Sequence, residues 1–190
     1  MKRVFIIHGW DGHPEEGWFP WLKKELEKRD FSVFVPQMPE ADKPKIKNWV
    51  STIIKIVDVA DENTYFVGHS IGCQAIARYI ETINTKIGGV VFVASFFKRL
   101  TNMEDDEVKN IAKPWLKILI DFEKVKNNIN QCVAIFSDDD KFVPADNQED
   151  IRKKFNARIA VEHRKGHFSG SGNNCIQLPE VLKALEEMTK

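Results

Sequence analysis

The 190-residue sequence lacks the features that mark secreted, metal-stabilised and membrane-spanning proteins. It has only three cysteines, Cys73, Cys132 and Cys175, and no Cys-x-x-Cys pair, which argues against a disulfide framework and a structural zinc site. The apolar stretch 4–7 is shorter than the apolar part of a signal peptide. No run approaches the roughly 18 apolar residues of a membrane span. We therefore expect a protein of the reducing cytoplasm.

The sequence also lacks an excess of charge of one sign, since it has 28 basic and 28 acidic residues. A basic excess is the usual mark of proteins that bind nucleic acid or anionic membranes, so we expect neither partner. Apolar residues make up 43% of the chain and charged residues 29%, as in ordinary globular proteins. A chain of this length can bury one continuous core, and we expect residues 1–190 to form one domain.

Short apolar segments alternate with amphipathic segments along the chain. The predicted strands are 4–7, 31–35, 64–67, 88–93, 133–136 and 158–161. The predicted helices are one that starts at Pro14, then 45–57, 71–81, 114–125, 145–155 and 178–188. This alternation predicts an α/β fold with a mostly parallel six-stranded sheet and helices on both faces. Ligands of such sheets bind outside the carboxyl ends of the strands, where the strand order reverses. If the second strand lies on one side of the first strand and the third on the other, that reversal falls between the first and third strands.

A Gly-x-Ser-x-Gly pattern, with Ser70 at its centre, lies between the third predicted strand and the helix after it. This pattern is typical of a nucleophile elbow, in which a sharp turn presents the serine hydroxyl at the top of the sheet. Gly68 removes a side chain where the turn is crowded, and Gly72 lets the helix lie close to the neighbouring strand. Taken alone, Ser70 could equally be the N-cap of the helix, so its assignment depends on other loops.

Two later loops supply an acid and a base for Ser70. Three consecutive aspartates follow the fifth predicted strand, and the Asp-x-x-Val-Pro sequence favours Asp140, with Asp139 as the alternative. After the sixth strand, His167 follows a glycine on a loop that can reach the elbow, whereas His163 directly follows the strand and is the alternative base. The chain order serine, aspartate, histidine is that of α/β-hydrolases.

The reaction of such a triad also needs donors for the oxyanion and a pocket for the acyl group. The expected donors are the backbone N–H groups of Ile71, directly after the nucleophile, and of Trp10, in the loop after the first strand. Segment 94–126 departs from the regular alternation, and we expect it to form a small cap or substrate wall. Its candidate pocket residues are aromatic: Phe96, Phe97 and Trp115.

Four segments of the sequence carry a family resemblance. They read Ile-Ile-His-Gly-Trp, Val-Gly-His-Ser-Ile-Gly, Ser-Asp-Asp-Asp-Lys-Phe-Val-Pro and Lys-Gly-His-Phe. Together they resemble the small serine hydrolases of the retinoblastoma-binding protein 9 (YdeN-like) family, over nearly the whole chain. The resemblance implies a reduced α/β-hydrolase fold with Ser70 as nucleophile, Asp140 as acid and His167 as base. None of the cysteines lies in the Leu-x-Cys-x-Glu motif of the family's partner binding, so no protein partner is inferred.

The sequence therefore predicts a serine hydrolase that cleaves a small carboxylic ester or a related acyl bond through an acyl-enzyme. We expect no metal and no organic cofactor. The aspartates 138–140 lack the alternate spacing, the glycine and the distant glutamate of an EF-hand loop. An amidase or aminopeptidase with the same triad is one alternative. The other is a hydrolase scaffold that serves as a non-catalytic protein-binding module.

Overall fold

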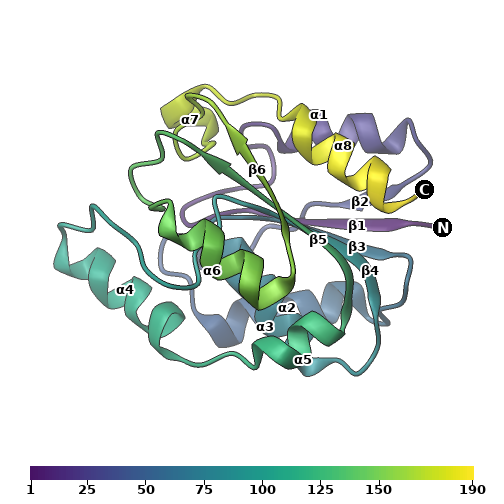
Figure 1. Ribbon diagram of the computed structural model, residues 1–190, viewed down its shortest axis with the longest axis horizontal. Helices are drawn as coiled ribbons and strands as arrows, with labels where there is room; N and C mark the ends of the chain where they lie inside the picture. The colour runs from purple at the N-terminus through teal and green to yellow at the C-terminus, as the bar shows by residue number, and fades with distance from the viewer.

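The computed structural model describes residues 1–190 and has a six-stranded sheet with helices on both faces (Figure 1). The strands are β1 (Arg3–Ile7), β2 (Ser32–Phe34), β3 (Thr64–His69), β4 (Ile87–Val93), β5 (Ile129–Ser137) and β6 (Arg158–Glu162). Their order is β2-β1-β3-β4-β5-β6, and every neighbouring pair is parallel. The predicted α/β fold is confirmed, and the strand order reverses between β1 and β3 as predicted.

Eight helices surround or extend the sheet. They are α1 (Phe19–Glu27), α2 (Ile46–Val57), α3 (Ile71–Thr82), α4 (Asp106–Lys117), α5 (Phe122–Asn127), α6 (Asp146–Phe155), α7 (Gly170–Asn173) and α8 (Pro179–Met188). Helices α1 and α8 cover one face, while α2, α3, α5 and α6 cover the other (Figure 1). None of the helices combines the length and the apolar composition that a membrane crossing requires.

The central strands are buried on both faces, which explains their continuous apolar sequences. Every residue of β3 is buried, and consecutive side chains alternate between the two cores. Phe66 packs with the core beneath α2 and α3, whereas Val67 packs with the core beneath α1 and α8. The two cores hold the carboxyl ends of β1, β3, β5 and β6 in fixed positions, and the loops at these ends carry the predicted site residues.

The helical segment after β4 differs from the prediction of one helix over 114–125. The structure has two helices there, α4 and α5, separated by a short irregular stretch. Helix α4 begins early because Asp105 caps it, accepting hydrogen bonds from the N–H groups of Glu107 (2.6 Å) and Val108 (3.4 Å). Acidic residues in its first turn stabilise this start. Pro114, which we interpreted as a helix start, lies inside α4.

The first helix begins at Phe19 rather than at Pro14, with Pro20 in its first turn. Gly17 has a φ of +53°, a conformation that favours glycine and interrupts a helix there. A Cβ on Gly17 would also lie 3.0 Å from the carbonyl oxygen of Cys175. The residues before α1 therefore form a loop that packs against the chain near α7.

Candidate active site

Ser70 lies in a sharp turn between β3 and α3. Its φ of 53° and ψ of −120° are rare for a residue with a side chain. Its backbone N–H donates to the carbonyl oxygen of Val93 at the end of β4 (2.9 Å), which holds the turn against the sheet. The residue is 9% exposed and lines a cavity. This strained strand-to-helix turn is the geometry of a nucleophile elbow.

The two glycines of the elbow are required by close packing. A Cβ on Gly72 would lie 2.5 Å from the carbonyl oxygen of Ile7 and 2.6 Å from that of His8. A Cβ on Gly68 would lie 2.8 Å from the backbone nitrogen of Cys73. Any side chain at these positions would push α3 away from the sheet, so the predicted reasons for both glycines are confirmed.

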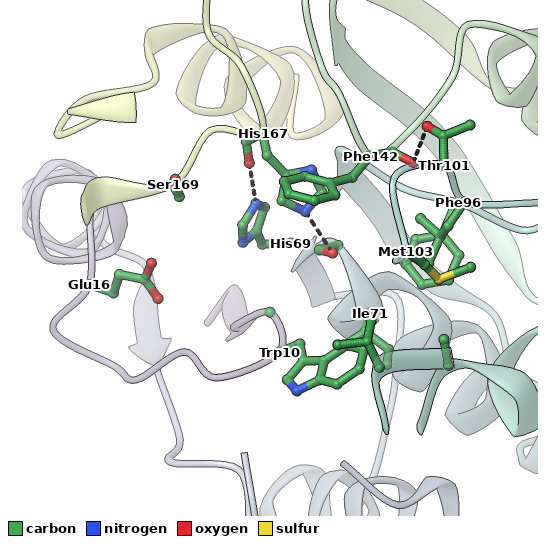
Figure 2. Close-up of a pocket in the computed structure, with 15 residues that line it drawn as sticks. Trp10, Glu16, His69, Ile71, Phe96, Thr101, Met103, Phe142, His167 and Ser169 are labelled. Atoms are coloured by element: carbon green, nitrogen blue, oxygen red, sulfur yellow. Dashed lines mark hydrogen bonds between the residues drawn. The ribbon is translucent and has the colours of Figure 1, made fainter. Parts of the chain in front are cut away.

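The imidazole of His167 connects Ser70 with Asp140. Its Nε2 lies 2.9 Å from Ser70 Oγ (Figure 2), and its Nδ1 lies 2.8 Å from Asp140 Oδ2. The other carboxylate oxygen accepts from the N–H groups of Phe142 (2.8 Å) and Val143 (3.1 Å), which fixes the side chain. With Nδ1–H donating to Asp140, Nε2 is free to accept the hydroxyl proton of the serine. The structure thus brings the three predicted residues together.

The three aspartates after β5 each hold a different part of the loop after β6. Asp138 Oδ1 accepts from the backbone N–H of Arg164 (2.9 Å), and Asp139 Oδ1 accepts from that of Gly166 (2.8 Å). Asp140 alone contacts the imidazole that faces the serine. The run of carboxylates therefore positions the histidine loop as a whole, and only its last member belongs to the hydrogen-bonded triad.

The alternative base, His163, lies away from Ser70. Its side chain is 85% exposed, and its Nδ1 lies 2.6 Å from Asp138 Oδ2. The alternative acid, Asp139, accepts a hydrogen bond from the hydroxyl of Ser137 (2.7 Å). Neither alternative residue makes a hydrogen bond to Ser70 or to the imidazole of His167.

Two further histidines are buried beside the triad. His69 Nε2–H donates to the carbonyl oxygen of His167 (2.7 Å), so it supports the backbone of that residue. Burial lowers the pKa of His69 to about 3, which keeps its imidazole neutral. His8 Nδ1–H donates to the carbonyl oxygen of Gly9 (2.8 Å), and its Nε2 accepts from the N–H of Met38 (2.9 Å). Burial lowers the pKa of His8 as well. Both imidazoles hold loops of the site in place.

Trp10 and Ile71, the predicted oxyanion donors, both border the cavity beside Ser70. The backbone N–H of Trp10 has no acceptor within the chain. Ile71 is the first residue of α3. The N–H groups of a first helical turn lack intrahelical acceptors and form the positive end of the helix dipole. The chain therefore keeps N–H groups near the serine, while their role as oxyanion donors stays a prediction.

The cavity beside Ser70 has a volume of about 270 Å³ and two unlike ends. Figure 2 shows Phe96, Thr101 and Met103 on one side of the His167 imidazole and Glu16 and Ser169 on the other. The first end is mainly apolar and the second is polar. The lining residues are Gly9, Trp10, Glu16, His69, Ser70, Ile71, Phe96, Leu100, Thr101, Met103, Val108, Ala112, Phe142, His167 and Ser169.

The structure corrects two of the three aromatic pocket candidates. Phe96 lines the cavity, but Phe97 and Trp115 do not. Phe97 packs into the core, with its ring centroid 4.9 Å from that of Phe155. Trp115 packs against Trp49, with ring centroids 5.9 Å apart. Both rings are buried among other aromatic side chains, which satisfies their large apolar surfaces without a ligand.

Several lining residues were missed by the sequence analysis. Val108 and Ala112 face the cavity from α4, and Leu100 and Met103 from the loop before it. The spacing of four between Val108 and Ala112 indicates a common helix face, but only once the helix is known to begin at Asp106. Segment 94–126 thus borders the cavity, and Figure 1 shows α4 beyond the ends of the strands.

Segment 94–126 is fastened to the body of the protein near both of its ends. Near its start, Asn147 Oδ1 accepts from the N–H groups of Phe97 and Lys98 (both 3.2 Å). Near its end, the buried Arg78 of α3 donates to the carbonyl oxygens of Trp115 (3.1 Å) and Ile118 (2.8 Å). The cavity-lining stretch lies between these two anchors.

The arrangement around Ser70 can activate a hydroxyl for attack on a carbonyl carbon. An imidazole in hydrogen-bond distance of the serine, oriented by a buried carboxylate, is the arrangement that nucleophilic serine chemistry needs. No group of three or more histidine, cysteine, aspartate or glutamate side chains in the molecule could hold a metal ion.

Comparisons with known proteins agree with this chemistry. The family described as serine hydrolase matches residues 4–187. The chain is 30% identical to YdeN of Bacillus subtilis (strain 168) over 169 residues, which cover 88% of this chain and 86% of YdeN. It is 24% identical to the serine hydrolase RBBP9 of Rattus norvegicus over 173 residues, which cover 90% of this chain and 86% of RBBP9.

Solved structures show the same fold. The crystal structure of the ydeN gene product from B. subtilis matches with a TM-score of 0.90 and 29% identity, covering 100% of this chain and 99% of the other. Est1E from Butyrivibrio proteoclasticus, with ferulic acid bound, matches with a TM-score of 0.74 and 15% identity, covering 98% of this chain and 90% of the other. The second likeness concerns the fold alone.

Proposed function

The chain belongs to the serine hydrolase family, and within this family we propose that it is a carboxylesterase acting on a small ester or related acyl compound. The observation that carries the proposal is the hydrogen-bonded row of Ser70, His167 and Asp140, with separations of 2.9 and 2.8 Å. The side chain of Asp140 is only 2% exposed, so water does not compete with it for the hydrogen bond to the imidazole.

In the proposed reaction, Ser70 Oγ attacks the carbonyl carbon of the ester while His167 Nε2 accepts its proton. Asp140 keeps the imidazole oriented and stabilises its charged form. The backbone N–H groups of Trp10 and Ile71 stabilise the oxyanion of the tetrahedral intermediate. His167 then gives the proton to the leaving alcohol, and the acyl group stays on the serine. In the second half of the reaction, a water molecule attacks the acyl-enzyme while His167 accepts its proton. His167 then returns the proton to Ser70, and the carboxylic acid is released.

The cavity supports an uncharged acyl group of modest size. Its volume of about 270 Å³ lies just below the usual range for small-molecule sites, which begins at about 300 Å³. The apolar lining contributed by segment 94–126 supports the proposal that this segment is the substrate wall. We further propose that the protein works in the cytoplasm, which its three free, buried cysteines support.

A fluorophosphonate probe tests the nucleophile, since it reacts with activated serines. We expect labelling of the wild-type protein and none of Ser70→Ala, together with hydrolysis of p-nitrophenyl butyrate by the wild type only. Equal labelling of both proteins would exclude Ser70 as the nucleophile. A wild-type protein that is folded but neither labelled nor active would favour the protein-binding module instead.

A further inference from the structure

Glu16 is the one carboxylate among the residues that line the cavity, and neither lysine nor arginine lines it. The side chain of Glu16 makes no hydrogen bond and no ion pair within the chain. Most other pocket-lining residues are apolar or belong to the triad and its loops. A carboxylate beside an apolar cavity has lost part of its hydration and gains from a cationic or hydrogen-bond-donating partner.

The position of Glu16 is set by the loop before α1. Its backbone N–H donates to the carbonyl oxygen of His13 (3.1 Å). A Cβ on Gly12 would lie 2.9 Å from Glu16 Oε2, and one on Gly170 would lie 3.5 Å from Glu16 Cγ. The two glycines therefore leave the space that the glutamate side chain occupies.

Glu16 and the apolar residues of the cavity lie on opposite sides of the His167 imidazole. His167 must deliver a proton to the leaving oxygen, so the leaving group lies next to the imidazole. Figure 2 shows Glu16 and Ser169 on one side of this imidazole and Phe96 and Met103 on the other. An ester that binds with its acyl chain at the apolar end extends its alcohol part toward the carboxylate of Glu16.

We propose that Glu16 selects esters whose leaving group carries a positive charge, such as esters of amino alcohols. The proposal rests on the esterase function proposed above and names its substrate class. In it, the ammonium group lies near the Glu16 carboxylate while the acyl chain lies against Phe96 and Met103. Glu16 is thus a specificity-determining residue and has no part in bond cleavage.

The surface beside the cavity supports a cationic substrate. An adjoining groove shares Trp10 and Val108 with the cavity, and its charged side chains are all acidic: Asp11, Asp42, Asp105 and Glu107. Only Glu107 is paired with a cation, Lys43, at 2.8 Å. Unpaired carboxylates beside the cavity raise the local concentration of cations and speed their association at low ionic strength.

Two esters of nearly the same shape, one cationic and one neutral, separate the effect of charge on kcat/KM from the effect of size. Butyrylcholine carries a quaternary nitrogen where 3,3-dimethylbutyl butyrate carries a carbon atom. We expect the wild type to show a kcat/KM about fivefold higher for the choline ester, as for a partly exposed ion pair. Raising the ionic strength is expected to lower this preference and to leave the hydrolysis of the neutral ester nearly unchanged.

Glu16→Gln keeps the size of the side chain and removes its charge. We expect the ratio of the two kcat/KM values to fall to about one, mainly through a higher KM for butyrylcholine, because the ion pair forms on binding. Glu16→Lys is expected to reverse the preference. The matched control is Glu15→Gln, which removes the same charge from the exposed neighbouring residue and is expected to keep the wild-type ratio.

The outcomes distinguish this inference from the proposed function. An unchanged ratio in both Glu16 variants, or a wild type that prefers the neutral ester, would overturn the role of Glu16. In that case, p-nitrophenyl butyrate hydrolysis and fluorophosphonate labelling of the wild type would still support the esterase. Loss of both of these wild-type activities would overturn the esterase itself.

Discussion

Two aspartate–histidine pairs join the same two loops of this protein, and they differ in surroundings rather than in length. Asp140 Oδ2 lies 2.8 Å from His167 Nδ1, and the two side chains are 2% and 17% exposed. Asp138 Oδ2 lies 2.6 Å from His163 Nδ1, and these side chains are 43% and 85% exposed. A short hydrogen bond between an acid and an imidazole is therefore no mark of catalysis.

The difference shows what the proposed catalytic pair has in addition. In the exposed pair, Asp138 raises the pKa of His163, and water surrounds the imidazole, so the pair acts as an ordinary surface ion pair. In the buried pair, the second nitrogen of His167 faces the hydroxyl of Ser70 at 2.9 Å. Burial of the acid and contact with the hydroxyl of Ser70 distinguish the two pairs, and variants of both test whether this difference decides catalysis.

The largest expected effect comes from removing one or the other imidazole. We expect His167→Ala to lower kcat for p-nitrophenyl butyrate about 10⁴- to 10⁶-fold, because the serine loses its base. The matched variant His163→Ala is expected to stay within about twofold of the wild type. Full activity in His167→Ala together with inactivity in His163→Ala would reverse the assignment of the two pairs.

The next effect comes from the acids. We expect Asp140→Asn to lower kcat about 10³- to 10⁴-fold, because the amide disturbs the tautomer and orientation of the imidazole. Asp138→Asn can still accept the hydrogen bond from the Arg164 N–H, so we expect nearly wild-type kinetics. Steady-state hydrolysis of p-nitrophenyl butyrate measures both variants. Comparable losses in the two would mean that the exposed pair also supports the reaction.

A smaller effect is expected at the apolar end of the cavity. Ala112→Phe adds a ring where α4 lines the cavity, so we expect kcat/KM for a hexanoate ester to fall about tenfold relative to the acetate ester. Lys113→Phe places the same ring on the exposed side of α4 and serves as the control. If the ratio of the two esters is the same in Ala112→Phe as in the wild type, the acyl group lies elsewhere.

Another expected effect concerns stability against acid. The pKa of His69 is about 3 in the folded protein and near 6.5 in the unfolded chain, so the unfolded state binds the proton first as the pH falls. Its contribution is fully present above pH 6.5 and is lost progressively toward pH 3, by about 2 kcal/mol at pH 5. Urea unfolding at pH 8 and pH 5 should show a smaller loss for His69→Gln than for the wild type.

His163 provides the contrast for this measurement. Asp138 raises its pKa, so any stabilising contribution would be present below about pH 6.5 and lost as the pH rises through the higher pKa of the folded state. Because both side chains are largely exposed, we expect no measurable change in the unfolding free energy of His163→Ala at either pH. A clear destabilisation at pH 5 would show that the exposed pair contributes more than its exposure suggests.

Much of the fold and the geometry around Ser70 could be predicted from the sequence, for a topological reason. Ser70, Asp140 and His167 each follow a short apolar strand, and the carboxyl ends of parallel strands meet at one edge of the sheet. The roles of Gly68 and Gly72 could also be predicted, because a tight turn and a close helix–strand contact each exclude a side chain.

The substrate side of the site could not be predicted in the same way. Phe96 and Phe97 are adjacent, and which of them faces the cavity depends on local backbone geometry such as the φ of 48° at Ala94. Pro114 was read as a helix start, although the Asp105 cap places that start earlier. Glu16 lies in a loop that we assigned to the first helix, so its position in the cavity required the structure.

The two anchors of segment 94–126 determine which part of the cavity wall could be exchanged to change the acyl specificity. The side chains of Asn147 and Arg78 hold its ends by hydrogen bonds to backbone N–H and carbonyl groups, which do not depend on the side chains between them. Thr101 and Asn102 also donate to the carbonyl oxygen of Lys141, next to Asp140 (2.8 and 2.6 Å), so these two residues should be kept. We therefore expect the stretch 103–111 to be exchangeable by loop grafting or by a focused mutant library, with the triad left as it is. New acyl specificities would then be sought by replacing one surface segment, and the strands that carry the chemistry would need no change.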